Sequence, residues 1–238
     1  IPLDSARGKQ TTRVWAEAGV SMATLVRETG KRGLAGLEWA GGLPGTVGGA
    51  IRGNAGAFRG EIKDATTQVE AIDEKGKRRT FSRKECKFGY RSSTFKEKNL
   101  VVLGSTFQLR RGKRAAIQAV AKDHIRYRKE RHPLEYPNAG SIFKNCDLKK
   151  VPKKLVEAMK DVIKMDPFPV IPTAAILARA KLQGLRVRDA QISEKHPNYI
   201  VNRGNASAKD VIGLIARVKK LIKKKFGIEL EEEISFPH

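Results

Sequence analysis

The sequence predicts an α+β protein with two domains. In the first half, apolar and polar residues alternate over several short segments, as is typical of half-buried strands. In the second half, apolar residues recur at helical spacing, and Ser, Pro and Gly lie where helices begin and end. A chain of 238 residues is long enough for two buried cores. We place the domains at residues 1–125 and 126–238.

Alternation in the first half predicts strands at 12–20, 66–73, 78–81 and 99–110. Gly76 lies between the second and the third of these, which predicts a β-hairpin. Ser21 can cap a short helix that follows the first strand. Ser82 and Glu85 have the spacing of a capping box and predict a short helical turn.

Helices are predicted in the second half at 114–131, around Leu155, Met159, Val162 and Ile163, from Thr173, and from Ser207 to Gly227. The first has Ile117, Val120, Ala121 and Ile125 at helical spacing, and we interpret it as the connection between the domains. Ser207 and Asp210 form a capping box, and Gly227 closes that last helix. Short strands are predicted at 188–193, 199–201 and 228–236.

A glycine-rich segment reads GLPGTVGGA at 42–50 and continues as NAGA at 54–57. Glycine lacks a Cβ atom and permits positive φ, so successive N–H groups can converge on phosphate oxygens or lie against a flat cofactor. The spacing does not match the G-x-G-x-x-G pattern of dinucleotide-binding folds, which disfavours a Rossmann domain. The segment therefore indicates a cofactor loop, with a plain connection between strands as the alternative.

The chain is strongly basic, with 48 Lys and Arg against 25 Asp and Glu, a net charge of +23 and a pI near 10.2. Such a charge suits a nucleic-acid-binding protein, because Lys and Arg displace phosphate counterions. However, the basic residues are spread over the chain, and aromatic residues make up only 6% of it. A surface on which bases stack is not predicted, so nucleic-acid binding stays the less favoured alternative.

Cys86 and Cys146 are far apart and have no nearby Cys or His partner, so neither a disulfide framework nor a metal site is expected. No apolar run of about 18 residues predicts a membrane span, and no secretory leader opens the sequence. We expect a soluble, monomeric cytoplasmic protein.

Three further segments follow the glycine-rich one in a definite order. They are FGYRSSTFK at 88–96, YPNAGSIFKN at 136–145, and AQISEKH at 190–196 with IVN at 200–202. Together with the closing LEEE at 230–233, this set resembles the UDP-N-acetylenolpyruvoylglucosamine reductase family over residues 14–236. Each motif is weak alone, but their order and spacing together are specific.

The resemblance implies the second lobe of a split, two-lobed FAD-binding domain, followed by an α/β substrate-binding domain. It implies FAD and NADPH as cofactors and a UDP-sugar as substrate. The implied reaction reduces UDP-N-acetylglucosamine enolpyruvate to UDP-N-acetylmuramate, in peptidoglycan precursor synthesis in a bacterial cytoplasm. The alternative among enzymes is another flavin oxidoreductase of the same cofactor fold, which need not keep the catalytic residues together.

Three catalytic residues follow from matching the family's motifs. Ser141 matches the proton donor, and Arg91 matches the arginine that holds the substrate carboxylate and stabilises the enolate. Glu233 matches an acid that donates a hydrogen bond to that carboxylate or orients Arg91 or Ser141. The residues expected to bind the cofactor are Pro44, Gly45, Thr46, Gly48, Gly49, Asn54 and Gly56. Those expected to bind the substrate are Tyr90, Arg131, Lys144 and Asn145.

The family begins with an N-terminal lobe that carries a Gly-Gly-Gly-Ser-Asn phosphate loop, and the present sequence has no such motif. Its first residues match the family just after that lobe. We therefore expect a fragment or a truncated gene product that by itself binds FAD weakly or not at all. Glu233 would pack near the absent lobe, so the sequence does not fix its position.

Overall fold

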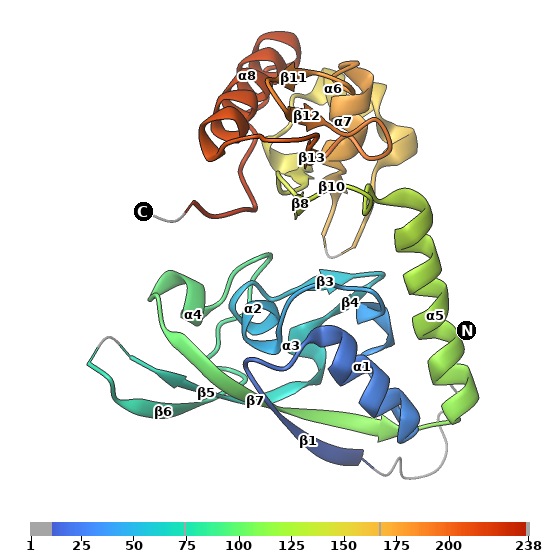
Figure 1. The fold of residues 1–238 in the computed structure, drawn as a ribbon, viewed down its shortest axis with the longest axis vertical. Helices are drawn as coiled ribbons and strands as arrows, with labels where there is room; N and C mark the ends of the chain where they lie inside the picture. The colour runs from blue at the N-terminus through green and yellow to red at the C-terminus, as the bar shows by residue number, and fades with distance from the viewer. Residues whose placement is uncertain (1–10, 74, 167, 237–238) are drawn as a thin grey trace. The chain divides into compact units, whose positions relative to one another are not determined.

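The computed structural model describes residues 11–73, 75–166 and 168–236 (Figure 1). The chain divides into two compact units, residues 1–128 and 129–238. The division lies in the same helix as the boundary that the sequence predicts at 125–126.

The first unit is built on an antiparallel sheet with the order β1-β7-β5-β6. Its strands are β1 (Thr11–Glu17), β5 (Thr66–Ile72), β6 (Arg78–Ser82) and β7 (Val101–Arg111), and the short β2 (Leu34–Ala35) also pairs with β7. The four strands and the hairpin predicted here are confirmed. Phe107 and Leu109 of β7 are fully buried, as the predicted inner face of this strand requires.

Short helices and one small hairpin cover this sheet. They are α1 (Met22–Lys31), η1 (Glu38–Ala40), α2 (Val47–Arg52), α3 (Ile62–Ala65), α4 (Thr94–Glu97), and the hairpin of β3 (Gly56–Ala57) and β4 (Gly60–Glu61). Figure 1 shows α1, α2 and α3 on the same side of the sheet. The glycine-rich segment therefore contains a helix and a hairpin strand, and it is not a plain connection.

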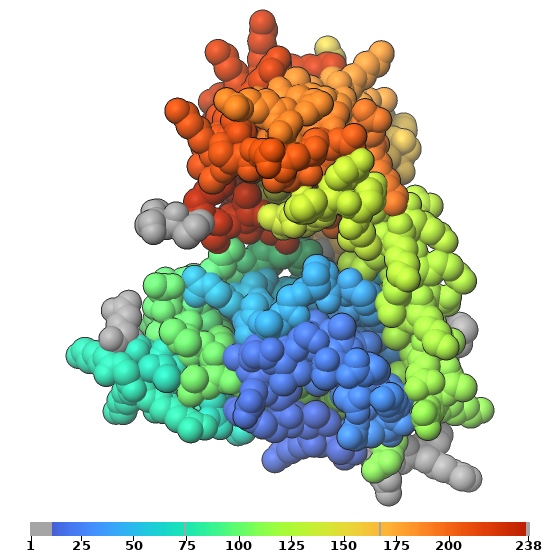
Figure 2. All heavy atoms as spheres, viewed as in Figure 1, coloured from blue at the N-terminus to red at the C-terminus, as the bar shows by residue number. Residues whose placement is uncertain are grey.

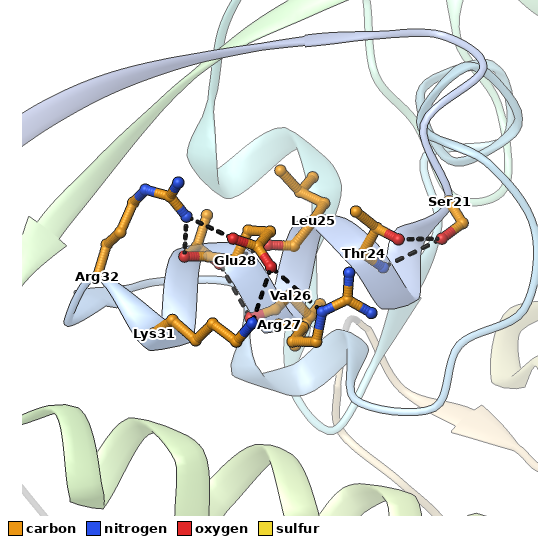
Figure 3. A network of polar contacts seen from close by, with 9 residues as sticks. Ser21, Thr24, Leu25, Val26, Arg27, Glu28, Lys31 and Arg32 are labelled. Carbon is orange, nitrogen blue, oxygen red and sulfur yellow. Dashed lines mark hydrogen bonds and ion pairs between the residues drawn. The ribbon is translucent and has the colours of Figure 1, made fainter.

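Helix α1 begins where the sequence predicts. The Ser21 hydroxyl accepts a hydrogen bond from the Thr24 N–H at 3.1 Å, which caps the helix. On the exposed face, Glu28 forms ion pairs with Arg27, Lys31 and Arg32 (Figure 3). These contacts add local order to the helix surface.

Helix α5 (Arg114–Arg131) has the predicted bounds but a different buried face. Val120 and Ile125 are 44% and 36% exposed, so the predicted apolar stripe is wrong at these two positions. The helix instead packs its backbone on glycine, because a Cβ atom added to Gly41 would lie 2.4 Å from the Ala121 carbonyl oxygen. Arg128 secures this contact by donating a 2.9 Å hydrogen bond to the Gly41 oxygen.

The second unit contains an antiparallel sheet with the order β11-β12-β13-β8 and a small pair of β9 with β10. Its strands are β8 (Asn138–Ser141), β9 (Cys146–Asp147), β10 (Val170–Ile171), β11 (Arg186–Val187), β12 (Ala190–Ile192) and β13 (Tyr199–Asn202). Its helices are η2 (Leu148–Lys150), α6 (Lys153–Ala158), η3 (Lys160–Val162), α7 (Thr173–Arg179) and α8 (Ala208–Phe226).

Helix α8 confirms both of its predicted ends. Ser207 and Asp210 form the capping box, and Gly227 has φ +68° just after the last turn. The helix buries one apolar stripe against the second core, and Figure 2 shows long side chains standing out from the surface around it. Within the described residues, no helix combines the length and apolar character needed to cross a membrane.

Three predicted elements are wrong in detail. The segment after Ser82 forms hydrogen-bonded turns but no helix. The helix predicted through Ile163 ends at Ala158, and a separate 3-10 turn follows it. The strand predicted at 228–236 is irregular, because it pairs with residues 142–144 through one bridge and flanking hydrogen bonds and not along a ladder.

Candidate active site

The turn that carries Arg91 lies against the glycine-rich segment within the first unit. Gly89 and Ser92 exchange backbone hydrogen bonds of 3.0 and 3.3 Å, which closes a tight turn over Tyr90 and Arg91. Arg91 has φ +54°, an uncommon conformation for a residue with a side chain. Its guanidinium donates a 2.9 Å hydrogen bond to the Gly56 carbonyl oxygen. Arg91 therefore lies next to a predicted cofactor residue.

Asn54 joins these two segments from inside the protein. Its side chain is fully buried and donates a 2.8 Å hydrogen bond to the Gly89 carbonyl oxygen. Its amide oxygen accepts a hydrogen bond from the Lys63 N–H at 3.3 Å. These contacts make Asn54 a support for the Arg91 turn, and its predicted contact with a cofactor stays a prediction.

Helix α2 holds the same turn from the other side. The Ser93 hydroxyl donates to the Arg52 carbonyl oxygen at 2.7 Å, and the Arg52 guanidinium donates to the Phe95 carbonyl oxygen at 2.8 Å. The Arg91 turn is thus fixed at both of its ends. Pre-organisation of this kind is what a charge-stabilising group in an active site requires.

The glycine-rich segment leaves an open edge at Pro44, Gly45 and Thr46, all three of which are exposed. Gly45 has φ +97°, and a Cβ atom added to it would meet nothing within 4 Å. Gly49 is also exposed, and only the Thr46 hydroxyl lies near its Cβ position, at 3.7 Å. This edge fits the close approach of a flat ring or an anion.

The remaining predicted glycines pack against the protein itself. A Cβ atom added to Gly48 would lie 2.9 Å from that of Ala18, and one added to Gly56 would lie 2.7 Å from Cγ of Glu61. The N–H groups of Gly48 and Gly49 donate to the Ala18 carbonyl oxygen and the Thr46 hydroxyl. Protein oxygens accept the hydrogen bonds of both N–H groups, so their contact with a cofactor phosphate stays a prediction.

Tyr90 is half-buried, and its ring forms a cation–π contact with the Arg91 guanidinium. The Arg91 guanidinium carbon is 5.0 Å from the centre of the Tyr90 ring. Tyr90 is therefore not a fully buried core residue.

Ser141 ends β8, and the residues before it are shaped by Asn138. The Asn138 amide donates to the Tyr136 carbonyl oxygen at 2.9 Å, and its oxygen accepts from the Gly140 N–H at 3.0 Å. Gly140 has φ +80° and open space where a Cβ atom would lie. Ser141 itself is half-buried and is paired with Tyr199 of β13. The predicted proton donor thus stands beside an uncrowded glycine.

A buried residue that sequence reasoning missed holds the chain just after Ser141. Asn198 is 4% exposed, and its side chain forms two hydrogen bonds with the backbone of Phe143. Its oxygen accepts from the Phe143 N–H at 3.1 Å, and its amide donates to the Phe143 carbonyl oxygen at 2.8 Å. The only available signal was a polar residue directly before the apolar strand β13.

The closing segment lies alongside the same residues. The Glu233 N–H donates to the Ile142 carbonyl oxygen at 2.7 Å, and the Lys144 N–H donates to the Glu231 carbonyl oxygen at 2.9 Å. Glu233 is half-buried. Its backbone therefore lies next to Ile142, the residue that follows Ser141. The sequence did not fix the position of Glu233, and contacts within the second unit define it.

The predicted substrate residues of the second unit have different surroundings. Lys144 is 18% exposed and forms an ion pair with Glu231. The Asn145 side-chain oxygen accepts from the Thr173 N–H at 3.2 Å. Arg131 is the exposed last residue of α5. Lys144 and Asn145 thus follow Ser141 closely in the sequence, and each has a partner within the second unit. Arg131 lies on a separate element, α5.

His132, His196 and Tyr199 form a ring cluster in the second unit. The Tyr199 hydroxyl lies 3.1 Å from Nδ1 of His132. Nδ1 of His196 is buried without a hydrogen-bond partner, and burial lowers the pKa of this imidazole below its ordinary value. The motif at 190–196 therefore contributes a packed, uncharged histidine beside β13.

Each unit thus carries one part of the predicted site. In the first unit, Arg91 and Tyr90 lie with the glycine-rich segment. In the second, Ser141, Lys144 and Glu233 lie on neighbouring stretches of backbone.

Two protein families match the chain. Residues 6–82 match the family described as FAD binding domain. Residues 132–237 match the C-terminal domain of UDP-N-acetylenolpyruvoylglucosamine reductase.

Curated relatives carry that same enzyme name. One from Carboxydothermus hydrogenoformans is 40% identical over 93% of this chain and 66% of its own length. Another from Thermotoga petrophila is 39% identical over 93% of this chain and 70% of its own length. The chain therefore spans about two thirds of the length of these relatives.

A solved structure is also similar. The UDP-N-acetylenolpyruvylglucosamine reductase of Thermus caldophilus matches with a TM-score of 0.74 and 32% identity. The match covers 94% of this chain and 73% of the Thermus chain.

Proposed function

Because this chain belongs to the UDP-N-acetylenolpyruvoylglucosamine reductase family, we propose that its site reduces UDP-N-acetylglucosamine enolpyruvate to UDP-N-acetylmuramate. In this proposal FAD is the cofactor, NADPH is the reductant, and the reaction supplies peptidoglycan precursors in a bacterial cytoplasm. The observation that carries the proposal is the hydrogen bond from the Glu233 N–H to the Ile142 oxygen. This hydrogen bond joins the backbone of Glu233 to the residue after Ser141, which supports a shared role for the two side chains in proton transfer.

The open edge at Pro44, Gly45 and Thr46 supports a place for FAD, since no side chain fills the space beside Gly45. When bound, FAD supplies the hydride chemistry, taking hydride from NADPH and passing it to the enolpyruvyl double bond. Gly49 lies on the same exposed edge. The roles of Gly48 and Gly56 are to let the protein pack closely behind that edge.

Arg91 is proposed to bind the substrate carboxylate. Hydride addition to one carbon of the double bond builds negative charge on the neighbouring carbon and the carboxylate. A guanidinium that is already oriented by Gly56 can stabilise this charge without reorganising. Its planar fork also matches a carboxylate through two parallel hydrogen bonds.

Ser141 is proposed to complete the reduction. Its Oγ–H gives a proton to the carbon that carries the enolate charge, so the double bond gains one hydride and one proton. A serine hydroxyl is a weak acid and needs a strongly basic acceptor such as this carbon. Glu233, held beside Ile142, is proposed to orient Ser141 or to donate a hydrogen bond to the carboxylate.

The remaining predicted residues are proposed to bind the rest of the substrate. Lys144 is mostly covered and paired with Glu231, so a substrate diphosphate would compete with that carboxylate for the ammonium. Asn145 follows on the same stretch of chain. Arg131 adds a further cation, and Tyr90 an aromatic surface beside Arg91.

The test follows NADPH oxidation by the natural gene product that carries this sequence. We expect the rate to depend on the enolpyruvyl UDP-sugar. Arg91→Lys should raise KM and lower kcat, because the ammonium cannot form two parallel bonds to a carboxylate. Arg79→Lys, on the exposed β6, is the matched control and should leave both unchanged. NADPH oxidation that ignores the sugar nucleotide would contradict the proposal and favour another flavin oxidoreductase.

A further inference from the structure

The first unit contains an open hollow whose lining includes none of the predicted site residues, although it lies next to Asn54 and the Arg91 turn. It has a volume of about 520 Å³ and is lined by Lys63, Arg83, Lys84, Lys87 and Phe88. Four of these five residues are cations. The hollow is broadly open to solvent, and its volume is in the range of sites that hold a small organic ligand.

Three of the cations come from one turn that follows β6. The Arg83 N–H donates to the Thr67 carbonyl oxygen at 3.1 Å, which anchors the turn to the neighbouring strand. Cys86 is fully buried, and its N–H donates to the Ser82 carbonyl oxygen at 3.1 Å. Lys87 has φ +44°, so the backbone reverses there. The turn is therefore held in shape while its basic side chains stay exposed.

The nearby acids do not neutralise this hollow. The Glu85 carboxylate accepts hydrogen bonds from the N–H and the hydroxyl of Ser82 and from Arg79. These contacts hold the pKa of Glu85 below its ordinary value, and Glu85 does not line the hollow. Glu61 forms an ion pair with Lys63, which offsets one cation. Three cations are left to set a positive potential in the hollow.

Phe88 adds an apolar surface to this basic wall. It is half-buried and packs against the core of the first unit, so its ring is held in place. We propose that this hollow binds a nucleotide, with its phosphates on Arg83, Lys84 and Lys87 and its base against Phe88. The proposal rests on these residues alone and does not depend on the proposed reductase activity.

The test is a titration of the isotopically labelled chain, followed by the amide NMR signals of residues 83–88. The probes are ADP, inorganic pyrophosphate and adenosine. We expect ADP and pyrophosphate to shift these signals, ADP to bind more tightly than pyrophosphate, and adenosine to have no effect at the same concentration. Binding should weaken with added salt, because exposed charges are screened.

Matched variants locate the binding. Arg83→Gln with Lys84→Gln should weaken ADP about tenfold, the loss expected for two phosphate contacts. The control is the adjacent exposed pair Lys113→Gln with Arg114→Gln in the same unit, which should bind ADP as the unaltered chain does. The NMR spectra also report whether each variant is folded.

Three results would overturn the inference. They are signals at 83–88 that do not move with ADP, equal weakening by both pairs of substitutions, and ADP binding no tighter than pyrophosphate. Ser141→Ala should leave the titration unchanged, so a failed reductase assay does not decide this question.

Discussion

Cys86 illustrates how a single buried group acquires unusual chemistry. Its side chain is fully buried, and burial raises the pKa of the thiol to about 12. Burial also raises the pKa of Cys146, which is only partly covered. The thiolate is the reactive form of cysteine, and a raised pKa lowers the fraction of thiolate at neutral pH. Both cysteines should therefore react slowly.

We therefore predict that native Cys86 resists alkylation. In a Cys146→Ser variant, a maleimide at mildly alkaline pH should not label the folded protein but should label it rapidly in guanidinium. Mass spectrometry measures the incorporation. Equal labelling rates in the folded and unfolded states would show that the thiol is accessible.

Glu28 has the opposite shift, on the exposed face of α1 (Figure 3). Hydrogen bonds from Arg32, then Arg27 and Lys31, lower the pKa of its carboxyl to about 2. A depressed carboxyl pKa stabilises the fold above the unfolded value and loses that contribution as the pH falls toward 2. Glu28→Gln should therefore flatten the decrease in Tm between about pH 4.5 and pH 2. The same dependence of Tm on pH in Glu28→Gln and in the unaltered protein would contradict this prediction. Added salt should reduce the difference in Tm between the two proteins.

Some residue roles follow from the sequence and others do not. Ser21 and Gly227 are predictable because a helix cap depends on its immediate neighbours. Asn54 and Asn198 are not, because their partners lie 35 and 55 residues away. A sequence shows that such an amide is polar, but the fold decides which backbone groups it reaches.

At the scale of elements, the Asn198 side chain links the start of β13 to the chain after β8. It bonds both the N–H and the carbonyl oxygen of Phe143, as the backbone of a neighbouring strand does. Asn198→Ala leaves the N–H and carbonyl oxygen of Phe143 buried without these partners. Each unsatisfied group costs about 1–3 kcal/mol, so the free energy of unfolding should fall by about 2 kcal/mol or more. Urea titration measures it. Asn205→Ala, at an exposed position, is the control, and a similar loss in both variants would contradict the special role of Asn198.

Close packing between α5 and Gly41, just before the glycine-rich segment, gives a second prediction at this scale. Gly41→Ala places a Cβ atom 2.4 Å from the Ala121 oxygen, so the helix must shift and stability should fall by about 1–3 kcal/mol. Gly49→Ala meets only Thr46 at 3.7 Å and should be neutral or stabilising by up to about 1 kcal/mol. Calorimetry measures the Tm of the two variants. Equal Tm values for Gly41→Ala and Gly49→Ala would show that close packing does not require glycine at position 41.

The elements themselves were partly predictable. Strands β5 and β6 follow from alternation around Gly76, whereas the irregular course of 228–236 depends on its pairing with 142–144. The sequence singled out the glycine-rich segment, but its composition did not reveal that Gly48 makes room for Ala18, or that Gly41 just before it makes room for Ala121.

At the scale of the whole molecule, the order of the motifs predicted the family, and the comparisons confirm it. The residues that match the motifs fall into two groups, one in each compact unit. The functional proposal uses both groups, so it concerns the protein as a whole. Lys144 and the basic turn at 83–87 contribute to the net charge of +23 and suit anionic ligands.

The central claim is that Ser141 gives a proton to the substrate after hydride transfer. In the flavin-loaded natural gene product, rapid mixing separates the reduction of FAD by NADPH from its reoxidation by the enolpyruvyl UDP-sugar. We predict that Ser141→Ala leaves the first step unchanged and slows the second by about 10²–10⁴-fold, the usual contribution of a general acid. Ser235→Ala, at an exposed position of the same unit, should change neither step. Unaltered reoxidation in Ser141→Ala would contradict the account.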